Sequence, residues 1–335
     1  MLLDAADRPR QTTEPHPTPQ SGLAAALLGL MLVFVACQAS GPSQTQSVPA
    51  SVATISSVVP TAAESVLCPT LGAVQYLTVQ TAEGSRQALV HLPAPTANGG
   101  PLPVVLVLHG LGGTTVDVED QTAFSTTADQ GGFIAVYPQG LGDPPSWDIA
   151  GASDTAFIGS LLTALELDAC VDPARIYAAG FSMGGGMVNA LGCRLADRIA
   201  AIAPVSGLYG PDWEGACAPV RPMPVIAFHG VLDPLVPYDG STAGADGPPV
   251  IAVESWAEGW ATRNHCDPGP VAQPAIGQVV PLFWHGCAAP VELYRINDGI
   301  HSWPSSSFDD PQANGEISAT ELIWQFFSTQ SLPPA

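Results

Sequence analysis

The chain has 335 residues and is strongly acidic, with 30 Asp and Glu residues against 9 basic residues, all of them Arg, and a formal net charge of −21. Such a charge repels nucleic-acid phosphates and anionic lipid headgroups, so it argues against both as binding partners. Hydrophobic residues make up 46% of the chain, which is enough for one large folded domain.

The first 36 residues have the pattern of a targeting segment. Arg8 and Arg10 precede an apolar run, 22–36, that has the length of a signal-peptide core and is short for a membrane span. The run ends in V-A-C, so that Cys37 stands where a bacterial lipoprotein signal carries its lipidated cysteine. We therefore expect lipidation at Cys37, with plain secretion or an uncleaved anchor as the alternatives.

A stretch rich in Ser, Thr and Pro, 37–66, should be a flexible tether, because it has too little periodic apolar content to fold. The folded domain is expected over 67–330. Apolar runs bounded by turn residues predict strands at 74–80, 87–92, 104–108, 133–137, 176–179, 200–205, 225–228 and 291–296. Helices are expected at 116–130, 154–167, 250–263 and 317–327, and residues 264–290 should be irregular. This alternation indicates an α/β fold, a mostly parallel sheet covered by helices on both faces.

The stretch 175–189 is the most informative part of the chain. Its apolar strand ends in Gly180-Phe181-Ser182-Met183-Gly184, and small residues that tolerate a helix follow. A strand–turn–helix connection of the G-x-S-x-G type projects the serine hydroxyl clear of the backbone, where a base can activate it. The start of the helix also offers free N–H groups to a developing oxyanion. We interpret Ser182 as a nucleophile; the alternative is a glycine-rich turn with an idle serine.

A serine nucleophile needs a base and an acid, which should lie past the carboxyl ends of other strands in the same sheet. The loop after 225–228 contains one carboxylate, Asp233, and the loop after 291–296 contains one histidine, His301. Asp298 is the alternative acid. The chain order Ser182, Asp233, His301 is that of the α/β-hydrolase fold.

Several other side chains of reactive types fit structural roles better, either bracing loops, capping a helix or lying incidentally near cysteines. These are His109, His229, His265, His285 and Asp154. Trp147 and Trp303 could contact substrate, because flat rings stack on sugars and aromatic acids, although plain core positions are the alternative.

The seven cysteines form no C-x-x-C and no cluster with zinc spacing, so we expect no structural metal. Without Cys37, six remain, an even number that suits three disulfides in an oxidising compartment. Nearness in sequence favours two pairs and leaves a third as the remainder: Cys193–Cys217, Cys266–Cys287 and Cys68–Cys170. Scattered buried thiols are the alternative.

Five segments together resemble an extracellular esterase family that includes single-domain polyhydroxybutyrate depolymerases, feruloyl esterases and acetylxylan esterases. The segments are H-G-L-G-G at 109–113, W-D-I-A-G-A-S-D-T-A-F-I at 147–158, G-F-S-M-G-G-G-M at 180–187, H-G-V-L-D-P-L-V-P-Y at 229–238 and H-S-W-P at 301–304. The resemblance, which covers roughly residues 70–328, implies an α/β-hydrolase. Its implied site consists of the nucleophile Ser182, the orienting acid Asp233, the base His301 and an oxyanion hole of the Met183 and Leu111 N–H groups. Where the family usually has a second glycine before the histidine, this chain has Ile300.

The resemblance also implies the function: hydrolysis of feruloyl, acetyl or 3-hydroxybutyrate esters by two-step acyl transfer, with no cofactor and no metal. The substrates would be small or oligomeric esters, including those derived from plant cell walls or polyesters. We expect an extracellular or cell-surface protein that meets a membrane only through its N-terminal segment. The alternatives are a serine peptidase of the same fold and an inactive surface-binding protein.

Overall fold

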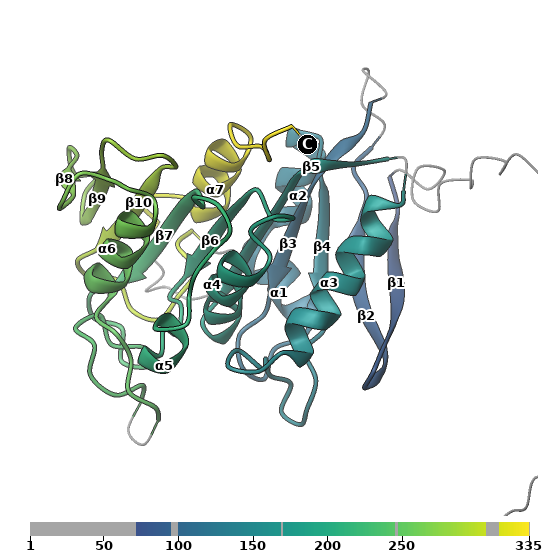
Figure 1. Ribbon diagram of the computed structural model, residues 1–335, viewed down its shortest axis with the longest axis horizontal. Coiled ribbons are helices and arrows are strands. Elements are labelled where there is room, and N and C mark those ends of the chain that lie inside the picture. Colours follow the sequence, from purple (N-terminus) through teal and green to yellow (C-terminus); the bar gives the residue numbers. More distant parts are fainter. Residues whose placement is uncertain (1–71, 95–99, 169, 245–246, 306–314, 335) are drawn as a thin grey trace, which may run out of the picture. The chain divides into compact units, whose positions relative to one another are not determined.

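The computed structural model describes residues 72–94, 100–168, 170–244, 247–305 and 315–334 (Figure 1). These residues belong to one compact unit, Pro60–Ala335. The expected signal segment with Cys37 and the whole of the expected tether, 37–66, fall outside the described residues, and both stay predictions. Among the helices of the described part, none is long and apolar enough to cross a membrane.

A single sheet of ten strands runs through the described residues, in the order β1-β2-β4-β3-β5-β6-β7-β10-β9-β8. The strands are β1 (Val74–Thr81), β2 (Gly84–His91), β3 (Leu102–Leu108), β4 (Ile134–Pro138), β5 (Val171–Phe181), β6 (Ala201–Val205), β7 (Val225–Gly230), β8 (Val271–Ala272), β9 (Val279–Trp284) and β10 (Val291–Ile296). The neighbours from β4 to β10 pair in parallel, and the strands at both edges pair antiparallel. The mostly parallel sheet predicted from the sequence is confirmed.

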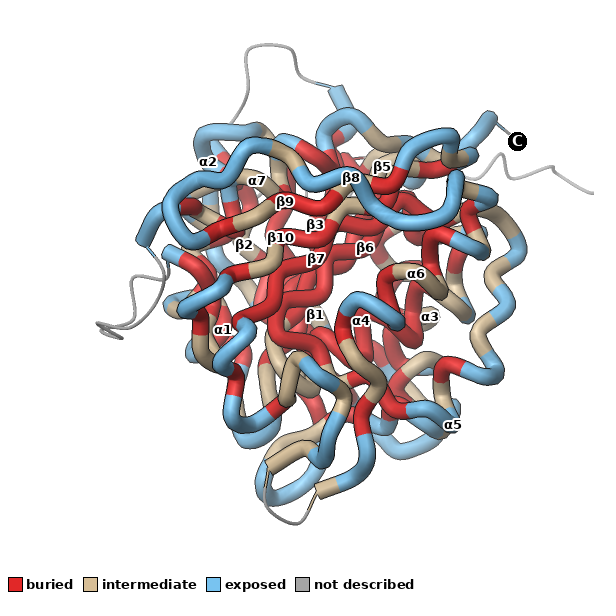
Figure 2. The backbone as a smooth tube through the Cα atoms, turned by 90° about the vertical axis from the view of Figure 1, so that its left-hand side faces the viewer, coloured by how far each residue is buried: buried red, intermediate tan, exposed pale blue. Residues whose placement is uncertain are grey.

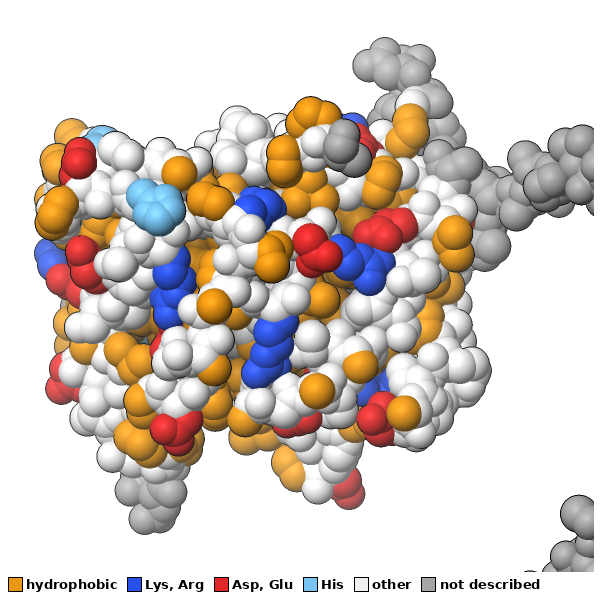
Figure 3. Space-filling model, in the orientation of Figure 1, with side chains coloured by type: hydrophobic (Ala, Val, Ile, Leu, Met, Phe, Trp, Pro, Cys, Tyr) orange, Lys and Arg blue, Asp and Glu red, His pale blue; other side chains and the backbone are white. Residues whose placement is uncertain are grey.

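Helices cover both faces of this sheet (Figures 1 and 2). The helices are α1 (Thr115–Thr122), α2 (Phe124–Gly131), α3 (Ser153–Glu166), α4 (Met183–Arg194), α5 (Pro211–Glu214), α6 (Val253–Arg263) and α7 (Ala319–Phe327). Helices α3, α4 and α6 pack into the core on one face, and α1, α2 and α7 pack into the core on the other. On the face that carries α3, α4 and α6, acidic and basic side chains are scattered among apolar ones (Figure 3).

Strand β3 shows why the chain folds as a two-faced layer. All seven of its residues are buried, and they alternate between the two cores: Val105 and Val107 enter one, while Val104 and Leu106 enter the other. A strand buried on both faces belongs in the middle of a parallel sheet. Because parallel strands end at the same edge, the loops that follow β3, β5, β7 and β10 gather at one edge of the sheet.

Two predictions about secondary structure were wrong. The helix expected at 116–130 is broken into α1 and α2 at Ala123, which has a left-handed backbone (φ 53°) and directs the next residue, Phe124, into the core. The segment 264–290 is not wholly irregular, because it contains β8 and β9. Strand β9 carries Pro281, which cannot donate to a neighbouring strand and is therefore a poor signal for a strand.

Two of the three expected disulfides are present, Cys193–Cys217 and Cys266–Cys287. Both join positions close in sequence, which is the signal on which the predictions rested, and these two are confirmed. Cys170 is also disulfide-bonded. Its expected partner, Cys68, lies outside the described residues, so that pairing stays a prediction.

Candidate active site

Ser182 lies at the turn between β5 and α4, with an unusual backbone conformation (φ 55°, ψ −118°). A residue other than glycine rarely adopts positive φ, and such strain persists only where the surroundings fix the backbone. Here Ser182 N–H donates to Val205 O at 2.9 Å, and Ser182 O accepts from Gly186 N at 3.0 Å and Leu208 N at 3.2 Å. The turn is therefore held from β6 and from the loop that follows β6.

The two glycines of G-x-S-x-G have a steric role in this turn. A Cβ atom at Gly180 would lie 2.6 Å from the carbonyl oxygen of Gly184, and one at Gly184 would overlap the carbonyl oxygens of Leu108 and His109. Only glycine lets α4 begin so close to the ends of β3 and β5. The predicted strand–turn–helix geometry around Ser182 is thus the geometry of the structure.

Asp233 and His301 meet although they belong to loops after different strands, β7 and β10. His301 Nδ1 donates to Asp233 Oδ2 at 2.7 Å, and the Asp233 side chain is fully buried. The other carboxylate oxygen, Oδ1, accepts from Leu235 N at 2.9 Å and Val236 N at 2.8 Å. Asp298, the alternative acid, is exposed, and His301 bonds to Asp233.

The carboxylate of Asp233 is held in its ionised form. Burial by itself would raise the pKa, but hydrogen bonds from His229 and His301, together with the Val236 N–H, hold the pKa of Asp233 well below its usual range. His229 Nε2 donates to Val236 O at 2.9 Å and lies 3.4 Å from Asp233 Oδ2. The prediction that His229 braces a loop agrees with this position.

The backbones of the two loops that carry Asp233 and His301 are joined directly. Leu232 N–H donates to Gly299 O at 2.9 Å, and a Cβ atom at Gly230 would overlap that same carbonyl group. The same Cβ atom would lie 2.7 Å from the backbone oxygen of Ile300, so this close approach needs glycine at position 230. The contact is with the backbone of Ile300, not with its side chain.

Ser182 and His301 line one cleft of about 680 Å³. The His301 ring packs against Phe181, the residue before Ser182, with 4.8 Å between ring centroids. Among the described residues, the hydrogen bonds of His301 include the one to Asp233 and none to Ser182. Catalytic hydrogen bonds are often long before substrate binds, so the shared cleft is the relevant observation.

Leu111 and Met183, the two residues expected to donate to an oxyanion, line the same cleft. Met183 is the first residue of α4, where backbone N–H groups have no acceptor within the helix. Leu111 lies in the loop that follows β3. Their convergence on one cleft is the arrangement that an oxyanion hole requires, and their role stays a prediction.

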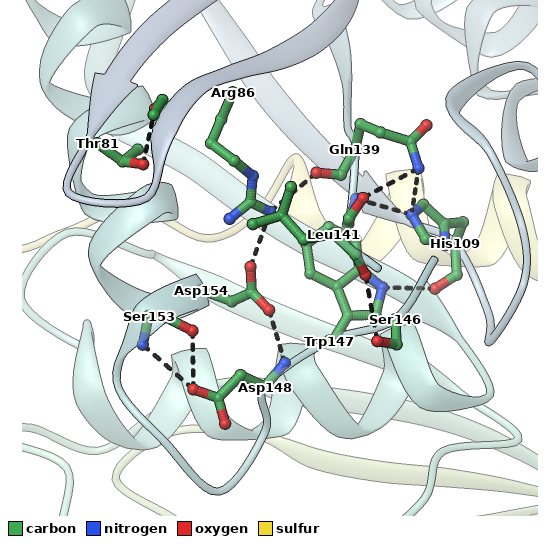
Figure 4. A network of polar contacts seen from close by, with 12 residues as sticks. Thr81, Arg86, His109, Gln139, Leu141, Ser146, Trp147, Asp148, Ser153 and Asp154 are labelled. Atoms are coloured by element: carbon green, nitrogen blue, oxygen red, sulfur yellow. Dashed lines mark hydrogen bonds and ion pairs between the residues drawn. The ribbon is translucent and has the colours of Figure 1, made fainter. Parts of the chain in front are cut away.

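A polar network includes His109, which lies two residues before Leu111, directly after the end of β3 (Figure 4). His109 Nδ1–H donates to Gly110 O at 2.7 Å, and its Nε2 accepts from Gly140 N at 2.9 Å. Burial lowers the pKa of His109, so the ring stays neutral, as this pair of hydrogen bonds requires. His109 O accepts from Trp147 Nε1 at 2.8 Å. The expected bracing role of His109 is the one that the structure shows.

The same network extends to a buried ion pair (Figure 4). Arg86 donates to Asp154 Oδ1 at 2.8 Å and to Gln139 O at 2.9 Å, and Asp154 Oδ2 accepts from Asp148 N at 2.6 Å. The Arg86 and Asp154 side chains are only 2% and 5% exposed. Asp154 is thus a loop brace. Sequence reasoning missed Arg86, whose only signal is a single positive charge in a strand with a buried face.

Trp147 and Trp303 are core residues, which corrects the prediction that they contact substrate. Trp147 is 2% exposed, and its indole N–H donates a hydrogen bond to His109 O. Trp303 is 1% exposed, donates to Thr320 Oγ1 at 2.9 Å and packs edge-on against Phe124. The tryptophan that lines the cleft is Trp213, which sequence reasoning did not single out.

The described residues contain no group of three or more His, Cys, Asp or Glu side chains that could hold a metal ion. The site is built from side chains that act in acid, base and nucleophilic chemistry.

Comparison with known proteins shows what the chain is similar to. A family model described as esterase PHB depolymerase matches residues 87–253. Feruloyl esterase B of Piromyces equi is 30% identical over 261 residues, which cover 74% of this chain and 46% of that protein. The chain thus spans about half the length of that relative. The putative esterase NocK of Nocardia uniformis subsp. tsuyamanensis is 30% identical over 243 residues, which cover 65% of this chain and 70% of that protein.

A solved structure shares the architecture. An acetyl xylan esterase from Aspergillus awamori matches with a TM-score of 0.57 and 15% identity, over 76% of this chain and 99% of that one. This likeness concerns the fold, and it confirms the predicted α/β-hydrolase architecture with its mostly parallel sheet. The match to the family model and the similarity to NocK together show that the chain belongs to the esterase PHB depolymerase family.

Proposed function

We propose that this member of an esterase family hydrolyses carboxylic esters with Ser182 as nucleophile, His301 as base and Asp233 as orienting acid. One observation carries the proposal. His301 is hydrogen-bonded through Nδ1 to a buried, ionised Asp233, and it lines the same cleft as the strained Ser182. An ionised carboxylate only accepts hydrogen bonds, so the proton of the neutral imidazole is on Nδ1 and Nε2 can accept a proton.

The reaction follows from these protonation states. Nε2 of His301 takes the Ser182 proton as Oγ attacks the ester carbonyl carbon. The tetrahedral oxyanion accepts hydrogen bonds from the Met183 and Leu111 N–H groups. When the intermediate collapses, His301 gives its proton to the departing alcohol and an acyl-serine remains. A water molecule, deprotonated by His301, then attacks the acyl carbonyl, releases the acid and restores the Ser182 hydroxyl.

The proposed substrates are feruloyl, acetyl or 3-hydroxybutyrate esters, small or oligomeric, from plant cell walls or polyesters. The similarity to feruloyl esterase B supports the first of these. We place the protein outside the cell or at the cell surface, because two disulfides join its described residues. Lipid attachment at Cys37 is part of this proposal and would hold the domain at a membrane.

The test compares Ser182→Ala with Ser160→Ala, which removes a half-buried helical hydroxyl that donates to Ala156 O of its own helix. Hydrolysis of p-nitrophenyl acetate should fall by about 10⁴-fold or more for Ser182→Ala and stay unchanged for Ser160→Ala. A fluorophosphonate probe should label the wild type and Ser160→Ala, and it should not label Ser182→Ala. Full activity of Ser182→Ala would refute the proposal, and absence of labelling in the wild type would indicate an inactive surface-binding protein.

Matched ester and amide substrates separate an esterase from a peptidase of the same fold. We expect methyl ferulate, acetylated xylan or hydroxybutyrate oligomers to be hydrolysed far faster than peptide amides. Faster cleavage of the amides would favour the peptidase.

A further inference from the structure

The cleft beside Ser182 is apolar. Of the described residues that line it, His301 is the one with an acidic or basic side chain, and apolar side chains of Leu208, Trp213, Val236 and Pro248 form much of the rest. An unpaired charge is costly to bury in such surroundings. The cleft therefore suits an ester whose larger group is uncharged and apolar.

Trp213 gives this cleft a flat wall. It lies on the short helix α5 and is half-buried. A Cβ atom at Gly210 would lie 3.0 Å from Cδ2 and Cε3 of the Trp213 indole, so the ring packs directly on the Gly210 backbone. One face of the indole is supported in this way, as a stacking surface requires.

Buried polar contacts fix α5, although four residues could not hold a helix in place by themselves. Glu214, the residue after Trp213, is 8% exposed; it accepts from Asn189 Nδ2 of α4 and lies 3.1 Å from Arg263 of α6. The disulfide Cys193–Cys217 also ties this region to α4, because it joins α4 to the chain just after α5. The mechanism does not use Glu214, and its burial is explained if it holds the Trp213 wall.

The attachment of α5 to α4 indicates which part of an ester would meet Trp213. His301 is held from the other direction, by the loops after β7 and β10, and it must face the oxygen of the departing alcohol. The group opposite the alcohol is the acyl group, which then lies on the side of α4 and α5. Figure 1 shows α5 beside α4 at the edge of the sheet where these loops gather.

We propose that Trp213, held by Glu214, is the residue that selects the acyl group, and that it favours uncharged acyl groups with a flat aromatic or other bulky apolar surface. This inference rests on the proposed function, because it needs Ser182 and His301 to define the acyl and alcohol sides. Trp213 acts by contact with substrate, and Glu214 is a positioning residue.

The kinetic test uses esters that differ in one group at a time: methyl cinnamate, methyl acetate and phenyl acetate. Trp213→Ala should lower kcat/KM for methyl cinnamate by about 10- to 100-fold and change methyl acetate and phenyl acetate by about twofold or less. Trp213→Phe, which keeps a flat ring, should retain most of the preference. The control is Trp324→Ala, a half-buried tryptophan that stacks on Phe133 away from the cleft, and its cinnamate-to-acetate ratio should equal that of the wild type.

A binding test separates this inference from the proposed function. In Ser182→Ala, titration calorimetry with N-methylcinnamamide, a neutral amide with the same acyl group, should show binding that weakens about 10-fold or more when Trp213→Ala is added.

Unchanged amide binding and an unchanged cinnamate-to-acetate ratio would overturn the role of Trp213 even if esters are hydrolysed. A loss confined to phenyl acetate would also overturn it, since Trp213 would then meet the alcohol. If Ser182→Ala hydrolyses esters fully, the proposed function fails, and the amide titration still reports on Trp213.

Discussion

His301 Nδ1 and Asp233 Oδ2 lie 2.7 Å apart across 68 residues of sequence. The carboxylate in this pair cannot turn freely, because its other oxygen accepts two backbone N–H groups from its own loop. The orientation of the imidazole is therefore set by a buried group that is itself fixed by the backbone. Such a pair selects one tautomer of histidine, and this tautomer is the one that can take a proton from Ser182.

Asp233→Asn should lower kcat on p-nitrophenyl acetate by about 10³- to 10⁴-fold, because a neutral amide can stabilise the wrong tautomer of His301 while it keeps the shape of the side chain. The matched control is Asp298→Asn, which changes the exposed carboxylate of the His301 loop. It should leave kcat within about twofold, in line with ordinary surface substitutions. A reversed outcome would make Asp298 the acid and would disprove the assigned pair.

The pH dependence of stability should carry a contribution from Asp233. Its pKa is lower in the folded protein than the usual 3.8, so the folded state favours the ionised form. This stabilisation is full above the unfolded-state pKa and is lost as the pH falls through the lower folded-state pKa. The free energy of unfolding of the wild type should therefore exceed that of Asp233→Asn by more at about pH 7 than at about pH 3. An equal gap in urea titrations at both pH values would contradict the depressed pKa.

Much of the fold could be predicted because its signals are local. The buried strand β3 is a continuous apolar run, and the turn at Ser182 needs glycine at two fixed positions, 180 and 184. The loops of Asp233 and His301 could be placed because each follows such an apolar strand. Parallel strands end at one edge, so the meeting of these residues follows from topology.

What could not be predicted depends on which atoms meet across the fold. Tryptophans at 147, 213 and 303 look alike in sequence, and only the tertiary structure buries two of them and leaves Trp213 in the cleft. Helix α5 is too short to show a period, and its position depends on contacts of Glu214 with two other helices. The break at Ala123 has no signal in the residue itself, because alanine normally favours a continuous helix.

The buried ion pair of Arg86 and Asp154 should matter for both stability and activity. Arg86→Met leaves the Asp154 carboxylate buried without its cation, which should cost about 3–5 kcal/mol. Since this carboxylate braces the segment that carries Trp147 and the His109 loop, kcat should also fall, by about 10- to 100-fold, as Leu111 loses its position. The free energy of unfolding is measured by urea unfolding and kcat by p-nitrophenyl acetate hydrolysis, both on the same protein preparations.

Two further variants test whether the unpaired charge is the cause. The double variant Arg86→Met/Asp154→Asn removes both charges and keeps an oxygen for the Asp148 N–H, so it should be more stable than Arg86→Met alone. Arg175→Met breaks the pair with Asp172, whose side chains are 38% and 25% exposed and thus far less buried than those of Arg86 and Asp154, and should change stability by about 1 kcal/mol or less. If Arg175→Met cost as much as Arg86→Met, burial of the ion pair would not explain the effect.

Backbone strain at Ser182 should be measurable apart from its chemistry. With φ 55° and ψ −118°, the residue adopts a conformation that glycine reaches easily and that other residues avoid, at a cost of order 1–3 kcal/mol. Ser182→Gly and Ser182→Ala both lack the hydroxyl, so both should be inactive, and they differ in whether a Cβ atom remains. We expect Ser182→Gly to be more stable than Ser182→Ala by about 1 kcal/mol in urea unfolding, since glycine's larger unfolded-state entropy offsets part of the strain relief.

The control compares glycine with alanine at position 128, inside α2, where the backbone is helical. There glycine should be the less stable residue, with Ala128→Gly less stable than the wild type by about 1 kcal/mol. If Ser182→Gly were instead the less stable of the two, the turn would hold Ser182 without strain, and no energy would be stored at the proposed nucleophile.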